Sequence, residues 1–331
     1  MANETINWGI IAPGRIAHKF AHDLQLAEGG RLHAVASRSL QRAEEFAREY
    51  HAPHAYGSYE EMLDCPGLDV VYIASPHSEH CAHALMCLEN GIPVLCEKPL
   101  AMNTAQVQRM VAAAKANDVF FMEALWTRFI PLFEETKRLV GEGAIGGIKT
   151  VRADFGFKAE FPPEHRLFNM KLGGGALLDV GIYPVFFALS FLGKPDEVQA
   201  TAVFGETGSD DSCGVLFKYN DGRLAILDAS ITVKTDTEAF LYGEDGALKL
   251  HGPFHHATEM SLTFYDRPSE RIGMNYKGNG YYHEIQEVMH CLKTGKKESE
   301  KLPLQFSLDL MEVLDWVRRE AGIVYGADRA G

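Results

Sequence analysis

The 331-residue sequence lacks the features that mark membrane and secreted proteins. It has no stretch of about 18 consecutive apolar residues, the length at which a run becomes a candidate for crossing a bilayer. Its first residues do not form the basic-then-apolar pattern of a secretory signal. It has only six cysteines and no C-x-x-C pair, so we expect reduced, mostly buried thiols and no disulfide framework. These absences predict a cytoplasmic protein without a membrane partner.

Positive charge is scarce relative to negative charge. Lys and Arg number 32 against 45 Asp and Glu, which gives a formal net charge of −13. Nucleic acids and anionic membrane surfaces attract basic proteins, so this balance argues against both as partners. A local group of arginines and backbone N–H groups can still bind an anionic cofactor inside an acidic protein.

The length suits two domains of ordinary size. In the first third, short apolar runs alternate with amphipathic segments, a pattern that predicts βαβ units and a parallel sheet. The expected strands are 6–11, 32–36, 70–74, 93–96 and 119–122, and the expected helices are 15–25, 40–50, 78–90 and 104–117.

From about Lys149 the pattern changes to strands joined by hairpin-like turns such as Asn220-Asp221-Gly222 and Glu244-Asp245-Gly246. We expect an α/β protein with a Rossmann domain (1–123) and a C-terminal α/β domain (124–331). The second domain should hold an open-faced, mostly antiparallel sheet that helices cover on one face only. Its expected strands are 149–159, 197–206, 213–219, 224–233, 239–242 and 259–265, and its helices are 176–191, 281–293 and 304–320, the last of which could pack on either domain.

The first strand leads into the sequence A-P-G-R-I-A at positions 12–17. A dinucleotide-binding turn reads G-x-G-x-x-G/A, and Gly14 and Ala17 satisfy its second and last positions, whereas Ala12 replaces the first glycine. An ordinary tight turn between a strand and a helix is the alternative. The candidate cofactor-binding residues of this turn are Ala12, Gly14, Arg15 and Ile16.

The end of the second strand distinguishes two cofactors. An acidic residue at this place usually binds the free ribose hydroxyl of NAD. This sequence has Ser37 and Arg38 instead, with Arg42 one turn further on. A hydroxyl followed by arginine suits a 2′-phosphate, so we expect NADP; a solvated arginine at a helix start is the alternative.

At Glu97-Lys98-Pro99 the sequence resembles the glucose–fructose oxidoreductase/inositol dehydrogenase/MocA (Gfo/Idh/MocA) superfamily. The resemblance covers nearly the whole chain. Within the superfamily the sequence is most similar to the branch of dimeric dihydrodiol dehydrogenases and NADP-dependent D-xylose dehydrogenases. Members of that branch share the W-T-R-F stretch and a tyrosine at the place of Tyr183. The resemblance also rests on YIASPHSEH (72–80), MEALWTRF (122–129), GGGALLDVGIY (173–183) and the Asp210-Asp211 turn.

The resemblance implies a dehydrogenase that transfers hydride at C4 of the nicotinamide of NADP(H). Its substrate would be the hydroxyl or carbonyl of a sugar, polyol or cyclic trans-diol. It also implies an open-faced sheet on which subunits often pair. Because helices cover this sheet on one face only, apolar side chains such as Val203, Leu216 and Ile226, or their alternating neighbours, should lie on the other face, and we expect a homodimer or higher oligomer that pairs there. Further residues expected at the cofactor are Ser75, Pro76, His77, His80 and Glu97, with capping or packing of the following helix as the alternative for His80.

A dehydrogenase that oxidises a hydroxyl needs a group that takes the O–H proton. Lys98 follows a parallel strand, where ligands of α/β sheets bind. Asp179 and Tyr183 share one helix face at a spacing of four, and we expect Tyr183, tuned by Lys98, to be the acid/base. The alternative makes Tyr183 a core aromatic residue and Asp179 a local cap. Trp126 and Arg128 should lie beside the nicotinamide, although a structural ion pair for Arg128 is the alternative.

Two other kinds of function remain open. One is redox-neutral glycoside cleavage or epimerisation with a tightly held cofactor, and the other is a non-catalytic NADP-binding regulator. Retention of both Lys98 and Tyr183 argues against the regulator. We expect no metal, because His251, His255 and His256 lack a carboxylate or thiolate at ligand spacing. Substrate specificity should lie in residues 155–169 and around Trp126.

Overall fold

The computed structural model describes residues 5–160 and 165–329 of the chain. The chain forms two compact units. The first contains the residues up to Trp126 together with Tyr276–Leu308, and the second contains Thr127–Asn275 together with the residues from Asp309 onward. The sequence predicts a single boundary near Glu123, whereas the division falls at three points and groups 276–308 with the first unit.

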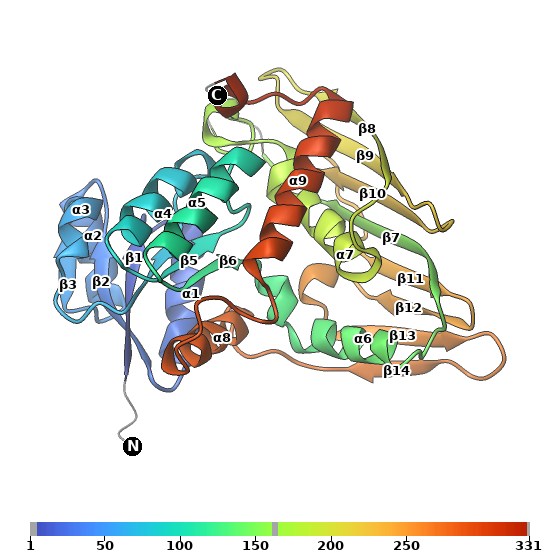
Figure 1. Cartoon of the computed structure of the whole chain (residues 1–331), viewed down its shortest axis with the longest axis horizontal. Helices are drawn as coiled ribbons and strands as arrows, with labels where there is room; N and C mark the ends of the chain where they lie inside the picture. Colours follow the sequence, from blue (N-terminus) through green and yellow to red (C-terminus); the bar gives the residue numbers. More distant parts are fainter. Residues whose placement is uncertain (1–4, 161–164, 330–331) are drawn as a thin grey trace. The chain divides into compact units, whose positions relative to one another are not determined.

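A six-stranded parallel sheet forms the centre of the first unit (Figure 1). Its strand order, β3-β2-β1-β4-β5-β6, is the order of a doubly wound dinucleotide-binding fold. Most of its strand residues are buried, as a parallel sheet covered on both faces requires. The strands are β1 Ile6–Ile11, β2 Gly30–Ala36, β3 His54–Tyr56, β4 Val70–Ile73, β5 Val94–Glu97 and β6 Phe121–Ala124.

Side-chain caps define where several helices of this unit begin. Ser39 accepts a hydrogen bond from the backbone N–H of Arg42, and Asn103 accepts one from that of Gln106. The helix α3 has five residues and the strand β3 has three. Segments this short show no clear hydrophobic periodicity, so the sequence predicts neither of them. The helices are α1 Arg15–Gln25, α2 Leu40–Glu49, α3 Tyr59–Leu63, α4 His80–Glu89, α5 Thr104–Ala116 and α8 Tyr282–Lys293.

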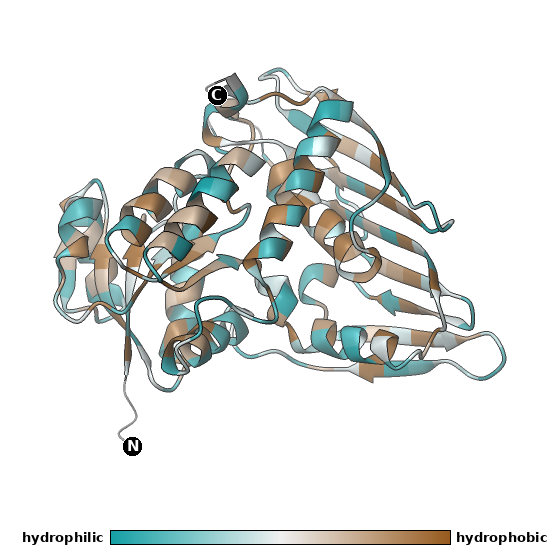
Figure 2. Cartoon of the chain, viewed as in Figure 1, coloured by the Kyte–Doolittle hydropathy of each residue, from teal (hydrophilic) through white to brown (hydrophobic). Residues whose placement is uncertain are grey.

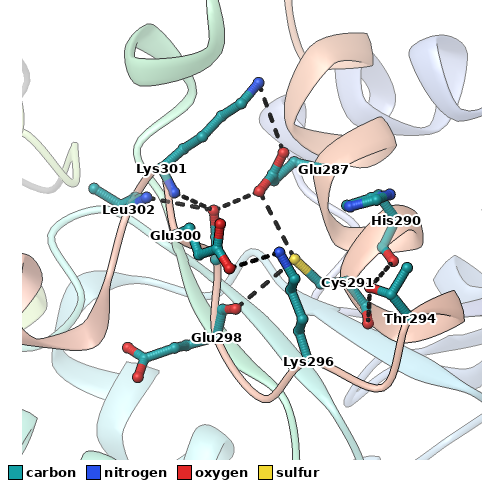
Figure 3. Close-up of polar contacts among 10 residues, drawn as sticks. Glu287, His290, Cys291, Thr294, Lys296, Glu298, Glu300, Lys301 and Leu302 are labelled. Atoms are coloured by element: carbon teal, nitrogen blue, oxygen red, sulfur yellow. Dashed lines mark hydrogen bonds and ion pairs between the residues drawn. The ribbon is translucent and has the colours of Figure 1, made fainter.

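The segment that follows α8 folds back and forms hydrogen bonds with that helix (Figure 3). The hydroxyl of Ser299 donates to Glu287 Oε1 at 2.6 Å, and the thiol of Cys291 lies 3.8 Å from the carbonyl oxygen of Glu298. The carbonyl oxygen of Lys297 then accepts the backbone N–H of Phe121 at 3.0 Å. The edge strand β6 therefore donates a backbone hydrogen bond to this returning segment, in agreement with the grouping of 276–308 with the first unit.

The second unit is built on an eight-stranded mixed sheet in the order β14-β13-β12-β11-β7-β10-β9-β8. Only the pair β7–β10 is parallel. The expected hairpin turns at 220–222 and 244–246 join β9 to β10 and β11 to β12. The strands are β7 Ile148–Gly156, β8 Glu197–Phe204, β9 Asp210–Lys218, β10 Leu224–Ser230, β11 Ala239–Gly243, β12 Gly246–Leu250, β13 Glu259–Phe264 and β14 Glu270–Gly273.

One face of this sheet packs against α7 (Ile182–Leu192), which follows a π-helical turn, Leu177–Gly181. Figure 2 shows α7 as predominantly hydrophobic. The helical run Met170–Leu192 is long and apolar enough to cross a membrane, but 89% of its apolar window is buried inside the protein, as in a core helix. The other helices are α6 Pro131–Gly141 and α9 Leu304–Ala321, which crosses the division between the units.

The opposite sheet face exposes apolar side chains. Along β10, Ala225 and Leu227 are buried, whereas Ile226 between them is 39% exposed. Val203 on β8, which has the same strand parity as Gln199 opposite Leu216 and Ile226, is 66% exposed. The predicted α/β fold with a parallel sheet and a second, mostly antiparallel sheet is thus confirmed.

Candidate active site

The turn between β1 and α1 has the backbone shape of a dinucleotide-binding turn. Ala12 adopts a left-handed conformation with φ of 61°, which glycine adopts without steric cost. Its N–H bonds to the carbonyl of Ala36, and its own carbonyl accepts the N–H of Gly14 at 2.7 Å. Ala12 therefore occupies the place of the first fingerprint glycine at the cost of some backbone strain.

Gly14 and the start of α1 leave room for an anion. A Cβ on Gly14 would meet only the carbonyl oxygen of Ala12 at 3.8 Å, so neither crowding nor φ requires glycine here. The N-cap residue of α1 is Gly14, which has no side chain to cap the helix, and the first turn, which begins with the exposed Arg15 and half-buried Ile16, contains no acidic residue. Open backbone N–H groups at a helix N-terminus bind phosphate well, so this turn fits a pyrophosphate.

Two arginines stand just beyond β2. Arg38 and Arg42 are both exposed, and the hydroxyl of Ser37 accepts the N–H of Ser39 at 3.3 Å. Burial raises the pKa of Tyr59, while a hydrogen bond and the positive charge of Arg38 act against this rise. Arg38 thus lies beside Tyr59 with its charge available at the strand end, as a 2′-phosphate requires.

The ends of β4 and β5 are joined through His80. Its imidazole is completely buried, with Nδ1 2.8 Å from the carbonyl oxygen of Pro99 and Nε2 2.8 Å from that of Ser75. His77 is also buried, with its ring 5.7 Å from that of His80, and Pro76 is half-buried. His80 therefore holds the two loops together and is not directed at a ligand.

Lys98 directly follows β5, and the neighbouring carboxyls of Glu97 and Glu123 are buried. The carboxylate of Glu97 accepts a hydrogen bond from the hydroxyl of Tyr72 and one from the backbone N–H of Lys98. Glu123 accepts the N–H of Leu100 at 3.0 Å, and its burial raises its pKa to about 7. Lys98 itself is half-buried. Glu97, predicted to bind cofactor, thus supports the loop that presents Lys98.

Trp126 and Arg128 fall in different units. Trp126 is buried in the first unit and stacks on Tyr281 with ring centroids 4.9 Å apart. Arg128 lies in the second unit, where its buried guanidinium forms an ion pair with Glu134 and lies over the ring of Phe133. The alternative structural ion pair for Arg128 is therefore present.

In the second unit, Asp179 and Tyr183 are both buried on the helical segment that opens α7. Asp179 Oδ1 accepts a hydrogen bond from Arg166 at 2.8 Å. The ring of Tyr183 lies 5.0 Å from that of His255 and 5.5 Å from that of Phe155. Arg166 lies within the expected specificity stretch 155–169, but the sequence predicts neither its pairing with Asp179 nor the contact of His255 with Tyr183.

Asp210 and Tyr325 contact the triple glycine (173–175) and the residues that follow it. The N–H of Leu177 donates to Asp210 at 2.7 Å, and the hydroxyl of Tyr325 donates to the carbonyl of Gly174. Gly175 has φ of 129°, and a Cβ there would collide with Asp210. Asp210, which begins β9 and does not form the turn expected at Asp210-Asp211, therefore positions the start of the Asp179–Tyr183 segment. Of the expected specificity stretch 155–169, residues 161–164 lie outside the described residues.

Each unit thus offers part of what a dehydrogenase requires. The first combines an open helix N-terminus, an arginine pair and a lysine at the strand ends. The second presents a buried tyrosine hydroxyl and a carboxylate one helical turn apart. Tyrosine and lysine are both side-chain types that serve in general acid–base catalysis.

Comparisons with known proteins agree with this architecture. Residues 6–125 match the oxidoreductase family with an NAD-binding Rossmann fold, and residues 133–249 match the Gfo/Idh/MocA C-terminal domain. The chain is 39% identical to the trans-1,2-dihydrobenzene-1,2-diol dehydrogenase of Danio rerio, over 98% of this chain and 99% of the relative, and 36% identical to the Homo sapiens protein of that name, over 98% and 99%.

Solved structures show the same fold at lower identity. A 3-ketoreductase from Actinomadura kijaniata in complex with NADP and TDP-benzene superimposes with a TM-score of 0.87 at 24% identity, over 96% of this chain and 98% of that one. The aldose-aldose oxidoreductase of Caulobacter crescentus, complexed with glycerol, gives 0.87 at 23% identity, again over 96% and 98%. The chain belongs to the Gfo/Idh/MocA family of oxidoreductases.

Proposed function

We propose that the protein is an NADP(H)-dependent dehydrogenase or reductase that acts on the hydroxyl or carbonyl of a sugar, polyol or cyclic trans-diol. The observation that carries the proposal is the cofactor edge of the first unit, where Gly14, Arg38 and Lys98 follow three strands of one sheet. Similarity over the whole length to trans-1,2-dihydrobenzene-1,2-diol dehydrogenases supports a diol or a related polyol as substrate.

The residues present fit NADP(H). The N–H groups at the start of α1 would hold the pyrophosphate, and Arg38 with Arg42 would hold the 2′-phosphate. The loops of Ser75–His77 and Glu97–Lys98, which His80 joins, would line the nicotinamide half. When bound, the nicotinamide donates or accepts a hydride at C4. The protein supplies orientation and proton transfer.

The proton would move at the hydroxyl of Tyr183. In oxidation, Tyr183 takes the proton of the substrate hydroxyl, and in reduction it returns that proton. We propose that the ammonium of Lys98 acts on the same substrate oxygen and favours the tyrosinate, because an opposite charge nearby stabilises an ionised phenol. Asp179, held by Arg166, would accept hydrogen bonds from neighbouring substrate hydroxyls.

We also propose that the enzyme is a cytoplasmic homodimer or higher oligomer that pairs through the open sheet face. The exposed apolar side chains of Val203 and Ile226 support that face as an interface. The six free, buried cysteines suit a reducing compartment. The net charge of −13 disfavours a nucleic-acid partner.

A substrate screen tests the function. Purified protein is mixed with NADP⁺ and aldoses, inositols or trans-dihydrodiols, and NADPH absorbance is followed. We expect steady reduction with at least one member of these classes. No reduction with any of them, together with a cofactor that stays bound through purification and substrate conversion without absorbance change, would instead indicate a redox-neutral glycosidase or epimerase.

A further inference from the structure

Three side chains of the first unit bring metal-binding atoms together outside the cofactor edge. His33 comes from β2, His54 from β3 and Cys65 from the loop after α3. One ligand atom from each lies within 4.8 Å of the other two. The His33 and His54 rings meet edge to face, with centroids 4.8 Å apart. The three residues come from separate elements, so no sequence spacing reveals them.

The donor set suits a borderline-soft divalent ion. Zinc binds thiolate and imidazole in tetrahedral sites, with bonds of about 2.3 Å to sulfur and about 2.0–2.1 Å to nitrogen. Such bonds place neighbouring ligand atoms about 3.3–3.6 Å apart. Side chains that already lie within 4.8 Å of one another would close around an ion through shifts on the order of 1 Å.

His33 has the hydrogen bonding of a ligating histidine. Its Nε2 lies 2.9 Å from the carbonyl oxygen of Pro66, so the neutral ring carries its proton on Nε2 and donates it there. Nδ1, buried in a side chain that is only 7% exposed, has no hydrogen-bond partner among the described residues. Metal-bound histidines donate their second N–H to a carbonyl in this way, which leaves the other nitrogen for the ion.

Cys65 and His54 complete the arrangement. The Cys65 side chain is 5% exposed and hydrogen-bonds with the hydroxyl of Tyr56, whereas His54 is half-buried on β3. His54 is thus the member of the cluster that lies nearest to solvent. Binding replaces the thiol S–H bond with an S–metal bond and releases one proton to solvent.

We propose that His33, His54 and Cys65 bind one zinc ion, with water as the fourth ligand. The ion would cross-link β2, β3 and the loop that follows α3. This inference departs from the expectation of a protein without metal, and it does not depend on the proposed enzymatic function.

The test uses the full-length, tag-free protein. Zinc is titrated by calorimetry in a non-chelating buffer, and cobalt(II) is added separately as a spectroscopic probe. We expect one zinc per chain, a sulfur-to-cobalt charge-transfer band and visible bands of tetrahedral cobalt. The substitutions Cys65→Ser and His54→Gln should each weaken zinc binding by at least about tenfold.

Cys81→Ser is the matched control, because Cys81 is equally buried, at 5% exposure, and lies outside the cluster. It should bind zinc like the wild type. His54→Gln changes a half-buried residue on the edge strand β3 and should still fold. It therefore tests the site even if Cys65→Ser fails to fold. Absence of zinc binding to the wild type, a cobalt spectrum without the thiolate band, or wild-type affinity in a folded His54→Gln protein would overturn the proposal.

Discussion

His80 and Pro99 belong to different loops of the cofactor edge, and the imidazole Nδ1 of the first lies 2.8 Å from the carbonyl oxygen of the second. Nε2 of the same ring lies equally close to the carbonyl oxygen of Ser75. Burial lowers the pKa of His80 to about 4, so the ring is neutral near pH 7 and donates to one carbonyl at a time. One ring thus sets the separation of the Ser75 and Lys98 loops.

His80→Ala should therefore loosen both loops. We expect the Kd for NADPH, measured by fluorescence titration, to rise at least about tenfold, which corresponds to about 1.4 kcal/mol. His290→Ala, which removes an exposed imidazole on α8, should leave the Kd unchanged. An unchanged Kd in folded His80→Ala protein would show that the ring only fills space.

Arg38 should determine the choice between cofactors. We expect the wild type to prefer NADP(H) over NAD(H) by at least about tenfold, or about 1.4 kcal/mol. Arg38→Asp replaces the phosphate partner with a ribose partner, so it should reverse the preference. Calorimetry with both cofactors measures this, and equal affinity of the wild type for NAD and NADP would contradict the assignment.

Tyr183 and Lys98 should carry the chemical step. Tyr183→Phe and Lys98→Met should each lower kcat by at least about a hundredfold, while the Kd for NADPH changes little in Tyr183→Phe. Tyr265→Phe, which alters a tyrosine that is 62% exposed, serves as the control. Near-normal turnover of Tyr183→Phe would remove it as the acid/base and leave it as a core aromatic residue.

Glu123 should make stability depend on pH. Its pKa is raised to about 7 by burial, above its value in the unfolded chain, so folding favours the protonated form. Stability from this group is present at low pH and falls as pH rises from about 4.5 to 7. Glu123→Gln keeps an acceptor for the Leu100 N–H but cannot ionise.

We therefore expect Glu123→Gln to gain up to about 3 kcal/mol in unfolding free energy at pH 8 and little at pH 4.5. Urea denaturation at both pH values measures this difference. Glu89→Gln, an exposed glutamate on α4, should show no such pH-dependent gain. An equal effect of Glu123→Gln at both pH values would mean that the carboxyl is ionised throughout.

The open sheet face should hold subunits together. Light scattering at micromolar concentration should give at least twice the chain mass of 36.7 kDa. The double change Val203→Glu and Ile226→Glu should produce monomers, because it places charges in the apolar face. Val324→Glu, at a residue that is 53% exposed and not on this sheet, should not. A monomeric wild type would exclude this interface.

The sequence predicts the two sheets well because apolar runs and turn residues are local signals. It misses β3 and α3 because they are short, and it places the last parallel strand at 119–122, whereas β6 spans Phe121–Ala124. It also misses α6, which begins at Pro131 within a mixed sequence, and the short strands β12 and β14.

The candidate site likewise contains some features that the sequence predicts and others that it does not. The turn at Gly14 and the loop of Lys98 follow from strand–turn–helix patterns, and the spacing of Asp179 and Tyr183 identifies their shared segment. The Asp179–Arg166 pair, the contact of Tyr183 with His255 and the contacts of His80 with two loops depend on tertiary packing, which leaves no periodic signal. The π-helical turn at Leu177–Gly181 is likewise set by packing around Asp210.

The hydrogen bonds of Asp23 have a consequence for protein engineering. This completely buried carboxylate on α1 accepts the backbone N–H groups of Asn279 and Tyr282, more than 250 positions away in the sequence. A fragment cut after Trp126 would lose these donors together with the segment that covers Asp23, and the face of α1 and β2 that packs on α8 would be exposed to water. We therefore expect a simple N-terminal truncation to be less stable than the complete cofactor unit. A working fragment would need residues 276–308 spliced to it, for example by circular permutation of the gene.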